Sequence, residues 1–322
     1  MHSRHLLIAL TLLTTLWSAY IHAQESYPSR AVRVMVHVAP GGGVDIQARL
    51  FSQKLSEQFG RAFLVENRPS AGGADAFGHV AKAAPDGYLL LAVNPSFTVP
   101  HAFAKNLPDP VKDFAPISLL SRAPFLLVVH PSIPVKTVKE FISLAKSRPG
   151  KLNFAGAPSG TATHLAAAWF FSAAKIDVSY VPYKGTGPAQ IALVGGETDA
   201  TMASVVSVRQ HINTGRLRAV GVTSSERSKV LPNLPTLAEQ GAPGYEYITF
   251  FGFVAPASTP IAILNKLNSE LARIVVLPEI ESKFLEEGAV TNRGTPLQFG
   301  QFIAAEVERW NKVVKITGIK AE

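Results

Sequence analysis

Three consecutive glycines, Gly41 to Gly43, separate a valine-rich stretch from an amphipathic segment. Valines alternate with other residues from 32 to 38, and this period of two predicts a strand. After the glycines, apolar residues recur at mostly four-residue steps from Ile46 to Phe59, which predicts a helix that Gly60 can end. Glycines leave main-chain N–H groups open, and a helix start adds partial positive charge, so this turn suits an anion. The same pattern also fits a glycine turn that binds nothing.

A second polar turn lies at Ser159, Gly160 and Thr161, where the chain enters another predicted helix. Taken alone, these residues fit an ordinary Ser/Thr N-cap as well as a ligand contact. His164 falls on the first turn of that helix, as a structural hydrogen-bonding histidine or as a ligand group. A hydrolase or lyase could use His164 with Ser159 or Thr161, but no third orienting group accompanies them.

Other chemistries lack their motifs. The glycines do not form a dinucleotide-binding G-x-G-x-x-G pattern, because Ile46 stands where the last glycine belongs, and no Walker motif or G-x-S-x-G elbow occurs. The chain has no cysteine, which excludes disulfides, thiol catalysis, a thiolate zinc site and a lipid-modified N-terminal cysteine. We therefore predict no enzyme, no catalytic residue, no cofactor and no bound metal.

The N-terminus predicts export. A weakly positive start at Arg4 precedes an apolar run from Leu6 to Trp17 and a small-residue exit ending at Ala23. This pattern is typical of a secretory signal peptide, here residues 1–23, cleaved near Ala23; the run is short for an uncleaved anchor, which is the alternative. The expected location is the periplasm. Cleavage removes one of 31 Lys and Arg residues and no acid, so the mature charge is 30 − 23 = +7. These charges are scattered, which argues against nucleic acid.

Strand–turn–helix units recur along the chain and predict an α/β fold with largely parallel sheets. Two extended segments, 123–132 and 247–256, are candidates for crossings between two domains. The expected strands are 62–66, 88–93, 151–155, 177–181, 198–202, 217–222 and 247–256, and the expected helices include 137–148, 161–174, 260–276 and 296–316.

Ten landmarks in order carry a family resemblance. They are "YPSR" (27–30), "PGG" before Asp45, "ENRPSAGG" (66–73), "AAPDGY" (83–88), "DPVKDFAPIS" (109–118), "VPYKGTGPA" (181–189), "RLRAVGVTS" (216–224), "LPNLPTLAEQG" (231–241), "FFGFVAP" (250–256) and "RWNKVVKITGIK" (309–320). With these, the chain resembles the Bug-type receptors, the periplasmic solute-binding proteins of tripartite tricarboxylate transporters.

The resemblance implies a type II periplasmic binding protein fold, with two α/β domains around a ligand cleft. Domain one would comprise 24–124 plus 249–322, and domain two 125–248. The implied function is a periplasmic receptor, expected as a monomer, that captures a small organic carboxylate for transporter membrane subunits. The same fold could instead act as a ligand sensor for the sensor kinase of a two-component signalling system.

The resemblance also implies a site. In this family two domain-one loops, which map to Pro40–Asp45 and Ala71–Ala74, grip one carboxylate through main-chain N–H groups and bridging waters, and a domain-two loop meets the distal end. The predicted ligand-binding residues are Val38, Pro40, Gly41, Gly42, Val44, Asp45, Ala71, Gly72, Gly73, Ala74, Asn94, Ser96, Ser159, Gly160, Thr161, His164, Ala203, Ser204 and Phe251. Asp45 would cap the helix start or orient the turn from behind. Phe251 would be a core aromatic or lie near the cleft.

Several residues depart from the family pattern. Val38 stands where an aromatic is common and Ala74 where Asn is frequent, while Ala203-Ser204 replaces a frequent Asp-Asn pair. The carboxylate-gripping frame is kept, but polar groups facing the far end of the ligand are thinned. We therefore expect a carboxylate whose far end is apolar, aromatic or modestly polar, in preference to a zwitterionic amino acid.

Overall fold

The computed structural model describes residues 27–38, 40–41, 43–70, 73–99, 107–158, 161–228, 230–286 and 288–318. The predicted signal peptide, residues 1–23, lies outside this part of the chain. Within it, we find no helix with the length and apolar character needed to cross a membrane.

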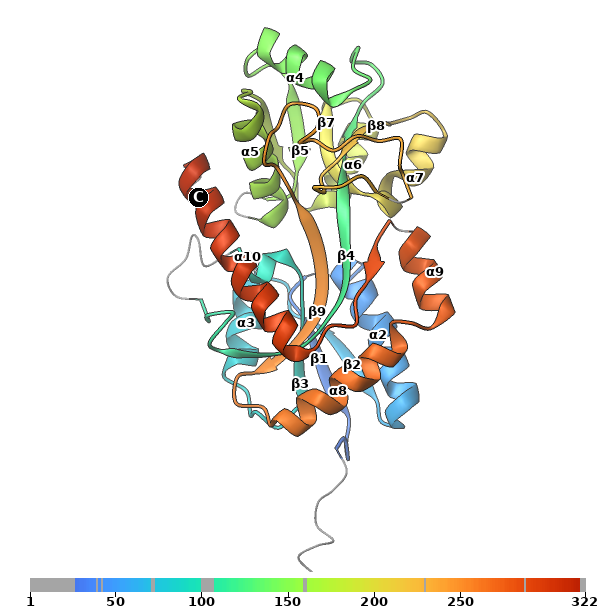
Figure 1. The fold of residues 1–322 in the computed structure, drawn as a ribbon, viewed down its shortest axis with the longest axis vertical. Helices are drawn as coiled ribbons and strands as arrows, with labels where there is room; N and C mark the ends of the chain where they lie inside the picture. Colours follow the sequence, from blue (N-terminus) through green and yellow to red (C-terminus); the bar gives the residue numbers. More distant parts are fainter. Residues whose placement is uncertain are drawn as a thin grey trace, which may run out of the picture.

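The sheet has a lower half in the view of Figure 1, surrounded by helices from both ends of the chain. β1 (Val32–Val36) pairs in parallel with β2 (Phe63–Asn67) and β3 (Leu89–Val93), and β3 pairs antiparallel with β9 (Ile248–Pro256). β9 in turn pairs with the first part of β4 (Phe114–Val129), which also pairs with the short β10 (Val290–Thr291). The helices of this half are α2 (Gly43–Phe59), α3 (Ala74–Ala81), α8 (Ile261–Ile274) and α9 (Pro278–Glu286).

The upper half repeats the arrangement with the middle of the chain (Figure 1). β5 (Asn153–Gly156) pairs in parallel with β6 (Ser179–Pro182) and β7 (Ala200–Ser204). β7 and β8 (Arg218–Val222) both pair antiparallel with the end of β4. The helices here are α4 (Val138–Ser147), α5 (Ala162–Ala174), α6 (Thr186–Val194) and α7 (Val205–Asn213). The predicted strand–turn–helix pattern is therefore confirmed in both halves.

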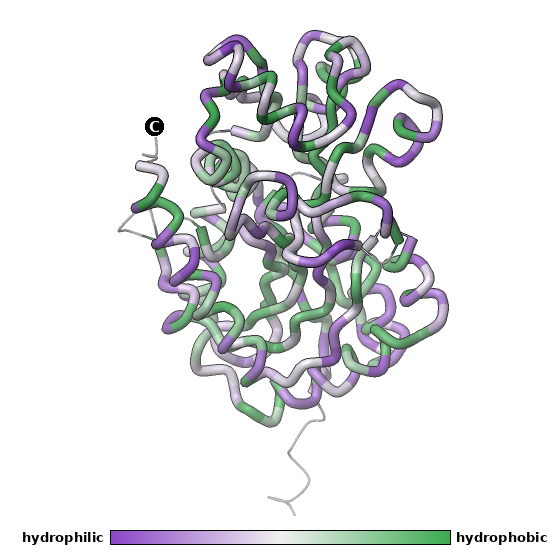
Figure 2. The backbone as a smooth tube through the Cα atoms, turned by 45° about the horizontal axis from the view of Figure 1, so that its top comes forward, coloured by the Kyte–Doolittle hydropathy of each residue, from purple (hydrophilic) through white to green (hydrophobic). Residues whose placement is uncertain are grey.

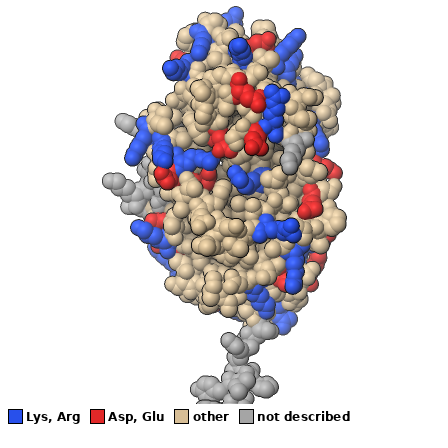
Figure 3. All heavy atoms as spheres, viewed as in Figure 1, with Lys and Arg blue, Asp and Glu red and all other residues tan. Residues whose placement is uncertain are grey.

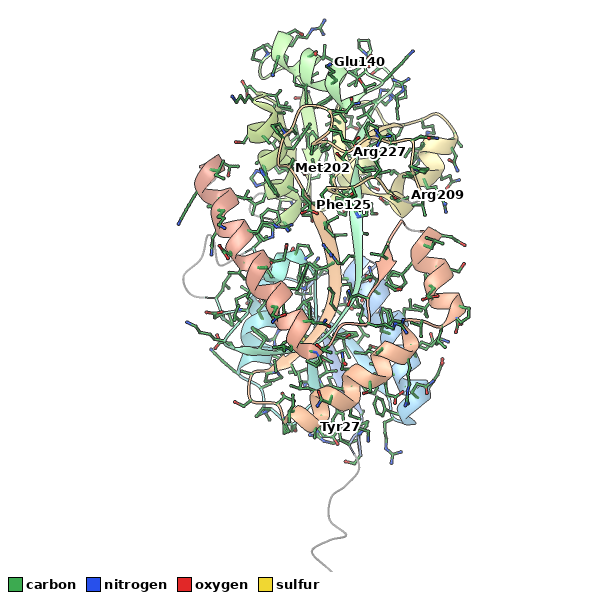
Figure 4. The ribbon with its side chains drawn as sticks, in the orientation of Figure 1. Tyr27, Phe125, Glu140, Met202, Arg209 and Arg227 are labelled. Atoms are coloured by element: carbon green, nitrogen blue, oxygen red, sulfur yellow. The ribbon has the colours of Figure 1, made fainter. Side chains whose placement is uncertain are left out.

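β4 joins the two halves as one strand of 16 residues. Its residues up to Pro124 pair with β9, and those from Phe125 onward pair with β7 and β8. Figure 4 shows Phe125 at the point where the strand passes from one half to the other. β9 begins beside this point, and Tyr247, which precedes β9, donates its N–H to Thr223 O in the upper half at 2.8 Å. Both segments predicted as crossings do connect the halves, although the first begins earlier than expected, at Phe114.

The strand register places the carboxyl ends of the parallel strands near Pro124 and Phe125, where β4 passes from one half to the other. In the lower half Val93, the last residue of β3, pairs with Gly252, toward the end of β9 that lies beside Pro124. In the upper half Ser204, the last residue of β7, pairs with Phe125. Since β1 is parallel to β3 and β5 is parallel to β7, the loops that follow all four strands lie at the junction of the halves. Loops at the carboxyl ends of strands are where open α/β sheets bind ligands.

Each half has its own apolar core, and α10 (Pro296–Thr317) contacts both. Phe299 and Ile303 pack with the lower core, while Trp310 and Val313, two to three turns later, pack with the upper one. The Trp310 ring lies 6.4 Å from that of Trp169 in α5. Figure 2 shows hydrophobic residues concentrated in the central strands, with hydrophilic residues on outer loops. The C-terminal helix, which the predicted division places in domain one, therefore packs against the cores of both halves.

Candidate functional site

The turn after β1 is held in place by one buried carboxylate. Asp45 is 2 % exposed, and its Oδ2 accepts hydrogen bonds from the Gly41 N–H at 2.9 Å and from Arg49 Nε at 3.1 Å. Its Oδ1 accepts from Asn67 Nδ2 at 2.8 Å, and Asn67 also donates to Val38 O at 3.0 Å. Gly41 precedes the helix, so Asp45 orients the turn from behind, as the second of the two hypotheses for it predicted.

This network keeps Asp45 ionised. Burial raises the pKa of the Asp45 carboxyl, but the hydrogen bonds from Arg49, the Gly41 amide and Asn67 together outweigh burial and leave the pKa below its usual value. Arg49 also donates to Asn67 Oδ1 at 2.8 Å, so its guanidinium is turned toward the back of the turn. A ligand carboxylate in front of the turn would therefore meet backbone amides.

The front of the turn is accessible. Pro40, Gly41 and Gly43 are exposed, and Gly41 has a φ of 85°, a conformation that favours glycine. A Cβ added at Gly41 or Gly43 would meet no atom within 4 Å. The Gly41 amide already donates to Asp45. Among the described residues of this turn, the amides of Gly43 and Val44 lie in the first turn of α2, where helix geometry gives them no partner within the helix. The predicted Gly42 lies outside the described residues.

The second predicted loop leads into α3 through Gly73, whose φ is 80°. The Gly73 N–H donates to Ser70 O at 3.1 Å, and Ser70 Oγ accepts from the Asp75 N–H at 3.1 Å. Ala74 is half-buried at the first helical position, where the backbone N–H has no hydrogen-bond partner within the helix. A Cβ at Gly73 would lie 2.5 Å from Phe77 Cζ, so this glycine is also required for packing. Ala71 and Gly72 lie outside the described residues.

The loop after β3 contributes two more of the predicted residues. Asn94 Oδ1 accepts from the Ser96 N–H at 3.0 Å, which caps a single turn of 3₁₀ helix, η2 (Pro95–Phe97). Both Asn94 and Ser96 are half-buried at the junction of the halves. Asn94 is therefore a structural cap, and its side chain also lies close enough to His37 to raise the pKa of that histidine.

His37 is a residue that sequence reasoning missed. It directly follows β1 and is only 3 % exposed, with its ring centroid 5.1 Å from that of Phe77. Neither ring nitrogen makes a hydrogen bond of normal geometry. Burial lowers the pKa of His37 to about 4, although the nearby Ala92 backbone and Asn94 side chain partly offset this effect. The imidazole is thus neutral near pH 7. Its type and its place before the glycine turn were the available signals, but its alternation with valines favoured an ordinary strand residue.

On the upper side, Thr161 is the N-cap of α5, as one of its two interpretations predicted. Its hydroxyl donates to Pro158 O at 2.8 Å and accepts from the His164 N–H at 3.4 Å. The His164 ring centroid lies 4.5 Å from that of Tyr180, whose hydroxyl donates to Ala157 O at 2.7 Å. Ser159 and Gly160 lie outside the described residues.

Ser204 ends β7 and precedes α7. Its hydroxyl lies 2.9 Å from that of Ser207, which donates to Ser204 O at 2.8 Å. Ala203 is only 1 % exposed and belongs to an apolar cluster with Leu126 and Val208. The methyl group of Ala203 therefore faces the core, and Ser204 is the member of this pair whose side chain is partly exposed.

Two other predicted residues also direct their side chains into the core. Val44 packs with the lower core, and Phe251 is stacked on Phe51 with ring centroids 5.8 Å apart. For Phe251 the core interpretation is the one that the structure supports. Val38 is half-buried against the same core. The side chains at these three positions pack against the lower core and present no polar group to the site.

The described residues offer little for catalysis or metal binding. The Thr161 hydroxyl is engaged in capping, and among the residues that the structure describes no group of three His, Cys, Asp or Glu side chains could hold a metal ion. Charged side chains of both signs are interspersed over the face shown in Figure 3. The arrangement fits an anion-binding site built on helix starts and turns.

The comparison with known families decides the classification. The family model described as "Tripartite tricarboxylate transporter family receptor" matches residues 47–319. The chain belongs to this family. Among curated proteins it is similar to the protein BugT of Bordetella pertussis, with 34 % identity over 299 residues that cover 92 % of each chain. The family and its relatives are solute-binding receptors rather than enzymes, as the sequence predicted.

Solved structures agree on the fold. R. palustris Rpa4515 with adipate is 33 % identical, with a TM-score of 0.84, over 91 % of this chain and 99 % of that one. MatC of Rhodopseudomonas palustris with bound malate is 33 % identical, with a TM-score of 0.81, over 89 % of this chain and 100 % of that one. The predicted type II periplasmic binding protein fold of two α/β domains is thereby confirmed.

Proposed function

We propose that this protein is a periplasmic receptor that captures a small organic carboxylate and delivers it to the membrane subunits of a tripartite tricarboxylate-type transporter. Residues 1–23 would be the export signal, cleaved near Ala23. The mature receptor would act as a monomer. Family membership supports transport rather than a sensor-kinase partner.

The observation that carries the proposal is the Asp45 network. A buried carboxylate ties the Gly41 amide to Asn67 of β2, which holds the glycine turn in one conformation before any ligand arrives. The only cationic side chain in this network, Arg49, is turned to Asp45 rather than to the exposed front of the turn. Preorganised amides at a helix start are suited to solvating a carboxylate.

The ligand would lie where the two halves meet. The change of β4 from the lower to the upper half after Pro124 supports the boundary between 124 and 125, and Ile248 at the start of β9 supports the boundary near 248. One carboxylate would bind at Pro40–Asp45 and Ala71–Ala74, with Asn94 and Ser96 beside it. The far end would meet Thr161, His164 and Ser204, none of which is acidic.

Relatives support a carboxylate as the ligand class. Rpa4515 was solved with adipate and MatC with malate. Because the Ala203 methyl group faces the core, the prediction about the far end now rests on Ser204 and the Thr161 loop. These groups offer hydroxyls and an imidazole, which suit an apolar or modestly polar far end.

A thermal-shift screen over mono- and dicarboxylates tests the proposal. A ligand at about a hundredfold its Kd adds about 2.7 kcal/mol to the free energy of unfolding. The midpoint should then rise by several degrees, and calorimetry on each hit should give one site per chain. No shift with any carboxylate, or turnover of a hit, would rule the proposal out.

A further inference from the structure

The outer surface of the upper half carries a groove that the carboxylate site does not use. It lies between α6 and the segment formed by α7 and the turn after it, and it has a volume of about 410 Å³. Gln190 Nε2 of α6 donates to Ser207 Oγ of α7 at 2.9 Å, which ties the two helices together. The residues that line this α6–α7 groove are Gly187, Gln190, Ile191, Val194, His211 and Arg216.

The groove has an apolar edge. α6 turns Ala189, Ala192 and Leu193 inward to the core, so its opposite side faces solvent. Ile191 lies on that side and is 75 % exposed, more than any other large hydrophobic residue in the described part of the chain. A single exposed isoleucine needs no explanation by itself, but Ile191 lines a groove, so a partner that fills the groove would also bury this side chain.

The opposite edge is cationic. Arg216 is exposed, His211 is half-buried, and none of the six lining residues is acidic. In the part of the chain that the structure describes, no acidic side chain pairs with Arg216, or with Arg209 of α7, which does not line the groove. Figure 4 shows Arg209 on the outer side of α7. The groove therefore complements a segment that carries an aliphatic side chain next to a carboxylate.

The exposure of Ile191 favours a protein over a small molecule. Small ligands are mostly enclosed by their pockets. A side chain at the edge that is three-quarters exposed is covered only by a broader surface. α6 begins after β6 and α7 begins after Ser204, at the strand ends that face the junction of the halves. A partner seated in the groove would contact two helices that begin beside the proposed ligand, and Gly187 at the start of α6 lines the groove itself.

We infer that the α6–α7 groove is a docking site for an acidic, periplasm-facing segment of the transporter membrane subunits, with Ile191 and Arg216 as its main contacts. This inference rests on the proposed transport function, since that function requires a receptor surface distinct from the ligand site. Contacts of this kind concentrate binding energy in a few residues.

The test measures binding of the full-length mature receptor to the membrane subunits held in lipid nanodiscs. Ile191→Asp and Arg216→Glu should each weaken that binding by about tenfold or more. Matched controls carry the same changes elsewhere: Ile316→Asp, at a site in α10 that is 69 % exposed, and Lys139→Glu, at an exposed site in the first turn of α4. Both controls should bind like the wild type. Affinity for the subunits should fall with added salt, less steeply in Arg216→Glu than in the wild type.

Two further measurements separate this inference from the proposed function. Carboxylate affinity, measured by calorimetry, should stay within about twofold of the wild-type value in both groove variants. Melting curves should show that both variants fold. Groove variants that bind the subunits as well as the controls do, or a wild-type receptor that does not bind them, would overturn the docking site. A receptor that binds subunits through the groove but takes no carboxylate would overturn only the proposed ligand class.

Discussion

The two sides of the proposed ligand site are held by different kinds of contact. In the lower half, Asp45 connects the glycine turn to α2 and β2 through a buried carboxylate, and Asn67 reaches back to Val38. In the upper half, Thr161 bonds to Pro158 and Ser204 lies against Ser207, each through hydroxyl contacts that span three residues. The lower side is held by a charged network that joins the glycine turn, α2 and β2. The upper side is held by hydroxyl hydrogen bonds between residues close in sequence.

The difference predicts that the lower turn is preorganised for a carboxylate and that the upper loops tolerate more change. A turn that folding has already fixed loses little entropy when a carboxylate binds. Loops held only by local hydroxyl contacts tolerate substitution, since each bond is worth about 1 kcal/mol. The two histidines also differ: His37 is buried beside Phe77, whereas His164 is half-buried against Tyr180.

The chemistry of the far end should give the largest effect. Heptanoate and 6-aminohexanoate have the same length, and they differ by a terminal methyl or ammonium group. Thr161, His164 and Ser204 offer no negative charge, so a desolvated ammonium would lose several kcal/mol. We expect heptanoate to bind at least about a hundredfold more tightly in calorimetry. Tighter binding of 6-aminohexanoate would show that the upper side carries an acidic partner and would break the comparison.

A second prediction concerns pH and His37. The pKa of this histidine falls from 6.5 to about 4 on folding, so between these values the unfolded chain binds more protons than the folded one. Its stabilisation is therefore complete above pH 6.5 and is lost as pH falls to about 4, by roughly 3 kcal/mol in all. The melting midpoint of the wild type should drop by several degrees between pH 7 and pH 4.5.

The variant His37→Leu isolates that contribution. It removes from the core beside Phe77 two ring nitrogens that make no hydrogen bond of normal geometry, so its midpoint at pH 7 should equal or exceed that of the wild type. Between pH 7 and pH 4.5 its midpoint should fall less. Asp45 acts in the same direction, but its lowered pKa places that loss below pH 3.8. Parallel pH profiles for the two proteins would contradict the assignment to His37.

The Asp45 network should show a smaller effect, on affinity more than on stability. Asp45→Asn removes the charge that holds Arg49 and the Gly41 amide, so the turn loses its fixed conformation. We expect carboxylate affinity to fall about tenfold. Asp75→Asn is the matched control, because Asp75 also lies in the first helical turn of a lower-half helix but is exposed. Equal affinities in calorimetry would mean that Asp45 serves packing alone.

Replacing the upper N-cap should give the smallest effect. Thr161→Ala removes the cap of α5, and Thr137→Ala removes the cap of α4, which has a full capping box far from the junction. Both should lower the free energy of unfolding by about 1 kcal/mol. Neither should change carboxylate affinity by more than about threefold. A loss of affinity confined to Thr161→Ala would show that the upper loop holds the ligand as specifically as the lower turn.

The sequence by itself determined the local structure and the family. The valine alternation and the apolar stripe after it predicted β1 and α2, and the Thr-Pro pair at Thr295 predicted the start of α10. These signals depend on neighbours within a few residues, so they can be seen without a fold. The ten landmarks identified the family for the same reason, since each is a short motif that can be read from consecutive residues.

Tertiary structure alone decided which side chains face the site. His37 is buried because β1 lies between β2 and β3 and is covered on both faces, which a period of two does not predict. Asn67 meets Asp45 because the register places Asn67 beside Val36, 31 residues earlier in the chain. Ala203 and Phe251 face the cores because the sheet faces on which they lie are covered, by residues such as Val208 for Ala203 and Phe51 for Phe251. Such contacts depend on pairing between distant segments, and a local pattern carries no information about them.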